Sequence, residues 1–164
     1  MGLTVKHDET EKTQIILESL DLLEWPILCN HLSTFAVTQQ GRHRCESFNL
    51  PINISLSQEL LHQTLEIGSL DISLDGGISF QGVHDLENIL MICSKGGVAT
   101  GEDLLKVAET LRAARKIRKL IFDQLIRPRL SELLIDIATL PDLQKLLEFG
   151  LDEGGRIADR ASTK

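Results

Sequence analysis

The chain has 164 residues, with 17 basic and 24 acidic side chains, a formal charge of −7 and 42% hydrophobic residues. This length predicts one compact domain or one lobe of a larger protein. The composition excludes a disordered chain, and no apolar run reaches the roughly 20 residues that span a bilayer. The polar start, Met1–Lys12, does not resemble a secretory signal. The acidic total disfavours a free-standing nucleic-acid-binding protein.

The three cysteines, Cys29, Cys45 and Cys93, form no CxxC pair, and their odd number argues against a disulfide framework. We therefore expect a cytoplasmic, reducing location and no contact with a membrane.

Hydrophobic spacing predicts helices along nearly the whole chain. The first helix is expected at 11–24, and the second at 26–40, with Pro26 in its first turn and Gly41 as its carboxyl-terminal cap. Later helices are expected at 42–48, from Ser57 to before Gly76, and at 85–94, 100–126, 130–140 and 141–149. Residues 78–83 fit either a brief strand or an extended crossover, and the last fifteen residues fit a hairpin.

The predicted fold class is all-α, a helical bundle in which one helix, 100–126, is longer than the rest. Thr100 and Asp103 have the spacing of a capping box at the start of that helix. The expected organisation is a flexible leader at 1–10, a helical core domain at 11–150, and a turn or short β-hairpin at 151–164 where the chain is truncated.

The sequence contains none of the common catalytic motifs. There is no GxxxxGK[ST], GxGxxG, HExxH or GxSxG pattern, and the three Gly-Gly pairs stand where helices are expected to stop. Cys29 with His31, and His43 with Cys45, are two residues apart, which places them about 200° apart on a helix and unable to share one metal ion. We expect Cys29 and His31 to pack into a core. No catalytic, cofactor-binding or metal-binding residue is predicted.

The charge is unevenly distributed. Residues 1–100 hold 5 basic and 13 acidic side chains, whereas residues 106–129 hold eight basic and two acidic ones. Four of the basic residues have the spacing of one helix face about 100° wide: Arg112, Arg115, Lys116 and Lys119. They are the candidate nucleic-acid contacts, since such a stripe can bind phosphates. Two observations favour the alternative of internal pairing: the acidic first half offers partners, and no interleaved aromatic residues provide a stacking platform.

Several segments resemble, in order, the second bacterial type of MutS homologue, which carries a Smr domain. They are LDLLEWPILCNHLSTFAVTQQG at 20–41, LLHQTLE at 60–66, GVHDLENIL at 82–90, KGGVATGEDLLKVAETLRAARKIR at 95–118 and LQKLLEFGLDEGGRIADRAS at 143–162. The resemblance covers nearly the whole chain after Thr13. It implies the amino-terminal part of the MutS core and lever region, without the ATPase and nuclease domains, so no catalytic residue can be transferred from the family.

The resemblance implies a longer parent protein. That parent would use ATP and Mg²⁺, bind branched or mismatched DNA, carry a Smr endonuclease, suppress homologous recombination, form a homodimer and act on collided ribosomes. This chain would then have a structural and allosteric role without catalysis, and its partners would be the remaining domains of its own chain. The alternative is a free-standing helical adaptor that binds a protein partner. That alternative requires a gene that ends near Lys164.

Overall fold

The computed structural model describes residues 14–51 and 53–161, which pack as two units, Met1–Asn49 and Leu50–Lys164. Residues 1–13 and 162–164 lie outside the described residues. The predicted leader at 1–10 is therefore outside them as well. The predicted domain limits at 10/11 and 150/151 stay a prediction. The fold class is all-α, as predicted, and in the described residues the only β-structure is an isolated bridge.

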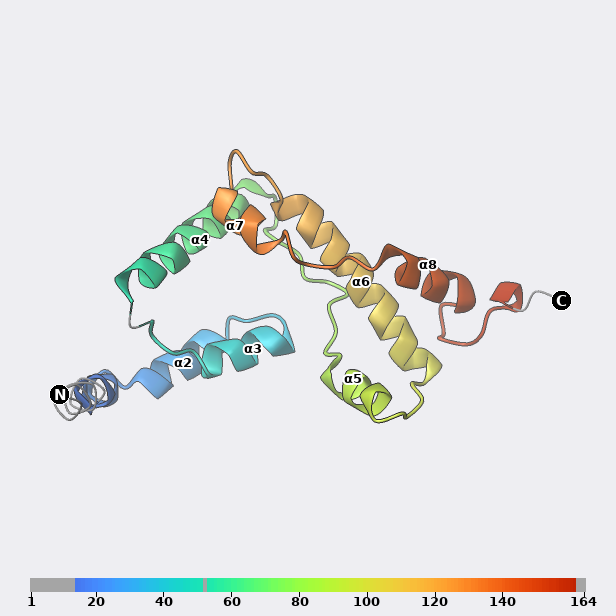
Figure 1. The fold of residues 1–164 in the computed structure, drawn as a ribbon, viewed down its shortest axis with the longest axis horizontal. Coiled ribbons are helices and arrows are strands. Elements are labelled where there is room, and N and C mark those ends of the chain that lie inside the picture. Colours follow the sequence, from blue (N-terminus) through green and yellow to red (C-terminus); the bar gives the residue numbers. More distant parts are fainter. Residues whose placement is uncertain (1–13, 52, 162–164) are drawn as a thin grey trace, which may run out of the picture. The chain divides into compact units, whose positions relative to one another are not determined.

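In the first unit, residues 14–22 are helical and two short helices follow, α2 (Trp25–Ser33) and α3 (Gln39–Glu46) (Figure 1). Cys29 is buried, and the indole Nε1 of Trp25 donates to the carbonyl of Phe48 at 3.0 Å. The prediction of one helix over 26–40 is wrong, because α2 ends at Ser33. Thr38 begins a new helix by accepting a hydrogen bond from Gly41 N at 3.1 Å, so Gly41 lies inside α3 rather than capping a helix.

The second unit contains two long helices, α4 (Ile54–Ser73) and α6 (Gly101–Ile121), of 20 and 21 residues. Among the described residues α6 is the longest helix, as predicted, although α4 is only one residue shorter. The shorter helices are α5 (Glu87–Ser94), α7 (Pro128–Leu133) and α8 (Pro141–Gly150), followed by the 3-10 turn η1 (Asp159–Ala161). Helix α7 packs against α4, and α8 packs along α6 (Figure 1).

The boundaries of α6 and α7 differ from the prediction. Helix α6 ends at Ile121 rather than near Ile126, because Asp123 Oδ1 accepts hydrogen bonds from the backbone N–H groups of Leu125 and Ile126 and holds a turn there. Helix α7 begins at Pro128, two residues earlier than expected, and ends at Leu133. Residues 78–83 form no strand.

The predicted hairpin near the carboxyl terminus is present in its smallest form. Leu151 and Ile157 make one antiparallel bridge, and Asp152 Oδ1 accepts hydrogen bonds from Gly154 N and Arg156 N inside the turn. The guanidinium of Arg160 donates to the carbonyls of Glu148, Phe149 and Leu151, which are otherwise orphaned at the end of α8.

The capping box at the start of α6 is confirmed. Thr100 Oγ1 accepts from Asp103 N at 3.2 Å, and Asp103 Oδ2 accepts from Thr100 N at 3.1 Å. We expect Thr100→Ala to lower the free energy of unfolding by about 1 kcal/mol, measured by urea titration. Thr64→Ala in α4 is the control, because the Thr64 hydroxyl only donates to Leu60 O within its own helix. Equal effects of the two changes would contradict a capping role for Thr100.

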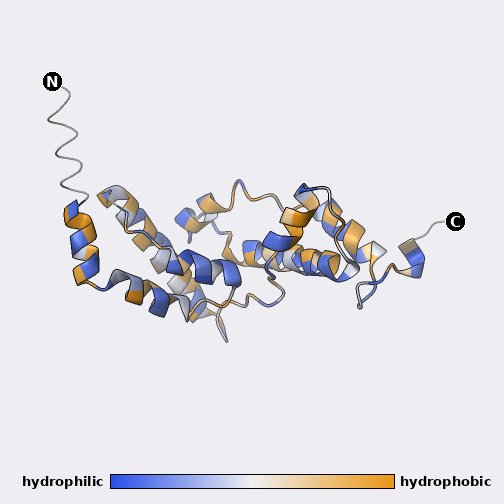
Figure 2. Cartoon of the chain, turned by 90° about the horizontal axis from the view of Figure 1, so that it is seen from below, coloured by the Kyte–Doolittle hydropathy of each residue, from blue (hydrophilic) through white to orange (hydrophobic). Residues whose placement is uncertain are grey.

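Apolar and polar residues alternate around the helices (Figure 2). Few apolar side chains are fully covered; the buried ones in the second unit are Leu70, Ile89, Ala108, Ala113, Leu130, Leu151 and Ala158. Many large ones are exposed, among them Ile72 at 87% and Leu125 at 96%. Within the described residues, no helix combines the length and the apolar character needed to cross a membrane.

Candidate nucleic-acid interface

Helix α6 carries the predicted stripe, Arg112, Arg115, Lys116 and Lys119, and all four side chains are exposed. The same helix also carries packed positions: Ala108, one turn before Arg112, is 2% exposed, and Ala113 is 6% exposed. The hairpin turn contacts the start of α6, and α8 packs along α6. These contacts hold in place the helix that carries the four exposed cations. We call these four residues the cationic face.

Arg112 has a partner within the second unit. Its Nε and Nη2 both lie 2.9 Å from Glu148 Oε1 on α8. The two side chains are 50% and 32% exposed, and ion pairs of this kind contribute about 0–1 kcal/mol because water screens them. Both donors meet one oxygen, so the pair lacks the two parallel hydrogen bonds of the strongest arginine–carboxylate pairs.

Glu148 is also held by its own helix. Gln144 Nε2 donates to Glu148 Oε1 at 2.6 Å, and the Gln144 side chain is almost fully buried. The Gln144 Oε1 atom finds no hydrogen-bond partner in the described residues. A buried acceptor without a partner costs about 1–3 kcal/mol. The orientation in which the Gln144 amide N–H₂ donates to Glu148 carries this cost, because it leaves Oε1 unpaired.

These contacts lower the pKa of the Glu148 carboxyl. The hydrogen bond from Gln144 has the largest effect, and Arg112 and the charge of Arg115 add to it. A lowered folded-state pKa contributes stability above the ordinary value of 4.5, and this contribution is lost as the pH falls through the folded-state pKa. We therefore expect the wild-type chain to lose more stability than Glu148→Gln on acidification below 4.5, measured by urea midpoints. Parallel curves for the two proteins would contradict this assignment.

The other three cations of the face are free of such partners. Within 14–51 and 53–161, the side chains of Arg115, Lys116 and Lys119 make no hydrogen bond or ion pair, although the charge of Arg115 acts on Glu148. Lys116 lines a groove of about 770 Å³ between α6 and the 74–84 segment. His84 closes one side of that groove, with its Nε2 2.5 Å from Glu109 Oε2 and its backbone N–H bonded to Thr110 Oγ1.

The other basic residues of 106–129 are engaged within the unit. Lys106 lies 3.9 Å from Asp103, Arg118 stands over the ring of Phe122 at 5.6 Å, and Arg129 pairs with Glu59 at 3.0 Å. Internal pairing, the alternative to nucleic-acid contact, therefore describes part of the basic segment. Most of the partners come from the second half of the chain rather than from the acidic first half.

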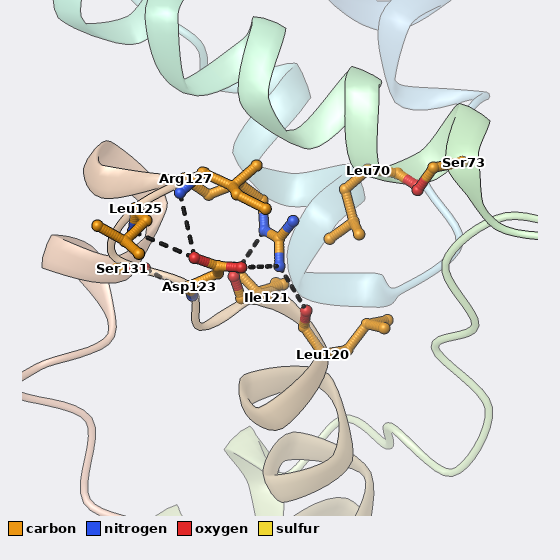
Figure 3. Close-up of polar contacts among 9 residues, drawn as sticks. Leu70, Ser73, Leu120, Ile121, Asp123, Leu125, Arg127 and Ser131 are labelled. Atoms are coloured by element: carbon orange, nitrogen blue, oxygen red, sulfur yellow. Dashed lines mark hydrogen bonds and ion pairs between the residues drawn. The ribbon is translucent and has the colours of Figure 1, made fainter.

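Arg127 is a structural residue that sequence reasoning missed. Its Nε donates to Ile121 O at 2.8 Å and its Nη2 to Leu120 O at 3.2 Å, which satisfies carbonyls at the end of α6 (Figure 3). Nη2 also lies 4.0 Å from Asp123 Oδ2, and Asp123 N donates to Ser131 Oγ in α7. In the sequence, the Arg127-Pro128 pair indicates only that a helix ends there, and it does not predict the contacts of the Arg127 side chain.

Glu66 joins α4 to the same region. Its carboxylate accepts hydrogen bonds from the backbone N–H groups of Arg129 at 3.2 Å and Leu130 at 2.9 Å, at the start of α7. A negative charge at this position also favours the helix dipole. The two long helices are thus tied together through α7.

The residues that the sequence pairs as possible metal ligands, Cys29 with His31 and His43 with Cys45, lie on α2 and α3 of the first unit. Cys29 is buried as expected, but His31 is exposed and meets Phe35 edge to face, so its predicted core position is wrong. His43 contacts Gln39 and Glu46 on α3. In the part of the chain that the structure describes, no three His, Cys, Asp or Glu residues gather as a metal site.

The fold and its charged face define a segment of helical scaffold with an exposed cationic helix. The chain is 38% identical over 157 residues to a protein named endonuclease MutS2 from Synechocystis, an alignment that covers 96% of this chain and 19% of that protein. It is 29% identical to an endonuclease MutS2 of Clostridium botulinum (89% of this chain, 19% of that protein) and 30% identical to one of Symbiobacterium thermophilum (88% and 18%).

The chain belongs to the MutS2 family. It spans about a fifth of the length of these relatives. No family model matches it, and no solved structure matches it either.

Proposed function

We propose that the chain is the amino-terminal helical core segment of a MutS2-type protein and that its role is mechanical. The observation that carries this proposal is the relation to the MutS2 proteins, in which nearly all of this chain aligns with a small part of a much longer protein. In this role α4 and α6 act as levers that position the clamp and ATPase domains and relay nucleotide state between them.

The contacts of the second unit support a lever role. Arg127 closes the end of α6, Glu66 holds the start of α7, and Arg129 pairs with Glu59 on α4. Levers transmit force only if their ends are fixed, and these charged contacts fix them. The exposed apolar side chains, such as Ile72 and Leu125, would be covered by the remaining domains of the same chain.

For the parent protein we propose ATP- and Mg²⁺-dependent binding of branched or mismatched DNA as a homodimer, with endonuclease activity in a Smr domain. Its proposed cellular roles are suppression of homologous recombination and action on collided ribosomes, both in the cytoplasm. Within this chain, the cationic face would contribute phosphate contacts, and the unpaired Arg115, Lys116 and Lys119 support that assignment.

The mechanical role is tested by comparing the chain with its full-length parent. We expect the 164-residue chain to hydrolyse no ATP, whereas the parent hydrolyses it and binds a four-way DNA junction. Robust ATP turnover by the chain alone would overturn the proposal.

The phosphate contacts are tested with the triple variant Arg115→Gln, Lys116→Gln, Lys119→Gln and a labelled DNA duplex at increasing salt. Each phosphate contact contributes about 0.9 to the slope of log affinity against log salt, so we expect a slope shallower by roughly 2–3. The matched control is Arg44→Gln, Lys95→Gln, Lys145→Gln, which removes the same charges from exposed positions elsewhere. Equal slopes for the two triple variants would reject the cationic face as the contact.

A further inference from the structure

Arg112 differs from the other members of the cationic face in having a carboxylate partner on a neighbouring helix. The donors Nε and Nη2 both contact Glu148 Oε1, while Arg115, Lys116 and Lys119 have no ion pair in the described residues. The face therefore contains three available cations and one that is already occupied.

We propose that Glu148 is a built-in competitor for phosphate, which withholds Arg112 from nucleic acid until a phosphate group displaces it. The inference rests on the proposed phosphate contacts of the cationic face and deepens them, because it states how the strength of binding is set.

The competitor is fixed independently of the arginine that it holds. Gln144, one helical turn earlier and almost fully buried, donates to the same Glu148 oxygen at 2.6 Å. When Arg112 leaves, this hydrogen bond keeps the carboxylate oriented toward the cationic face. The lowered pKa of Glu148 agrees with a carboxylate that stays ionised there.

The pair can also open. Both side chains reach solvent, and the two donors of Arg112 share a single oxygen, so a phosphate with several free oxygens offers the guanidinium a better-matched acceptor. Such a contact makes binding conditional on a phosphate density high enough to displace Glu148. A nucleic-acid backbone meets this condition, whereas isolated anions in solution do not.

The test measures the affinity of the chain for a short fluorescein-labelled DNA duplex across a salt series, for the wild type and five variants. Glu148→Gln should bind roughly fivefold more tightly, because the exposed ion pair that competes with phosphate for Arg112 is removed. Arg112→Gln should weaken binding by less than Lys116→Gln does, because displacing Glu148 uses part of the energy of the Arg112–phosphate contact. Arg112→Gln with Glu148→Gln should bind like Arg112→Gln alone. The matched control, Asp142→Asn, removes one exposed carboxylate from the same helix without freeing an arginine.

The outcomes separate the two proposals. If Glu148→Gln behaves like Asp142→Asn, or if Arg112→Gln weakens binding as much as Lys116→Gln, the competitor is overturned and the phosphate contacts stand. If neither the wild type nor Glu148→Gln binds the duplex, both proposals are overturned. The comparison of Arg112→Gln with Lys116→Gln does not depend on Glu148→Gln and holds even if that variant fails to fold.

Discussion

Replacing Arg127 with methionine is expected to lower the free energy of unfolding of the second unit by about 3 kcal/mol, because it breaks a largely buried charged contact. The Arg127 side chain is only 15% exposed. Its loss leaves the carbonyls of Leu120 and Ile121 without a donor and Asp123 without its cation. Methionine keeps the apolar part of the side chain, so the change reports on the guanidinium rather than on packing.

Two further variants identify the cause. Arg127→Lys should recover part of the loss, since an ammonium can reach one carbonyl but cannot reproduce the planar fork. Arg115→Met is the matched control, because the Arg115 side chain is exposed and makes no hydrogen bond in the described residues. Urea titrations followed by circular dichroism give the three values. An equal effect of Arg127→Met and Arg115→Met would show that the end of α6 does not depend on this side chain.

Local sequence signals account for the helices whose ends are set by neighbouring residues. The capping box of Thr100 and Asp103 and the first-turn position of Pro141 are both found where the sequence places them. These features are predictable because each depends on residues within one helical turn of one another. The same reasoning failed at Gly41, because a glycine after an apolar run signals a helix end only when no new cap precedes it, and Thr38 supplies that cap.

The candidate site could be predicted only in part. Helical spacing places Arg112, Arg115, Lys116 and Lys119 on one face, and the structure has them there. Spacing cannot show that Glu148 pairs with Arg112, because the two residues are 36 positions apart in the sequence. Nor can it show that Glu66 accepts a hydrogen bond from Leu130 at the start of α7, because these residues are 64 positions apart. Pairing across such distances depends on how the helices pack, which no local pattern determines.

The contact between Gly101 and Gly155 leads to the second prediction with a large expected effect. Whether Gly101→Ala stabilises or destabilises the chain shows whether helix propensity or steric overlap dominates at this position. Intrinsic propensity alone predicts that Gly101→Ala stabilises α6, since alanine is favoured over glycine in a helix by about 1 kcal/mol. In the folded chain, however, a Cβ at Gly101 would lie 1.7 Å from the carbonyl oxygen of Gly155 in the hairpin turn. That atom belongs to the backbone, so the turn or the start of α6 must move.

We therefore expect Gly101→Ala to destabilise the second unit by about 1–3 kcal/mol, the usual cost of overpacking, in spite of its better propensity. Gly68→Ala in α4 is the matched control, because a Cβ there meets nothing within 4 Å, and it should stabilise the chain by up to about 1 kcal/mol. Urea midpoints measured side by side should move in opposite directions for the two glycines. If Gly101→Ala raises the midpoint as Gly68→Ala does, the hairpin turn does not pack closely against the start of α6. The hairpin that follows α8 would then not help to hold α6 in position.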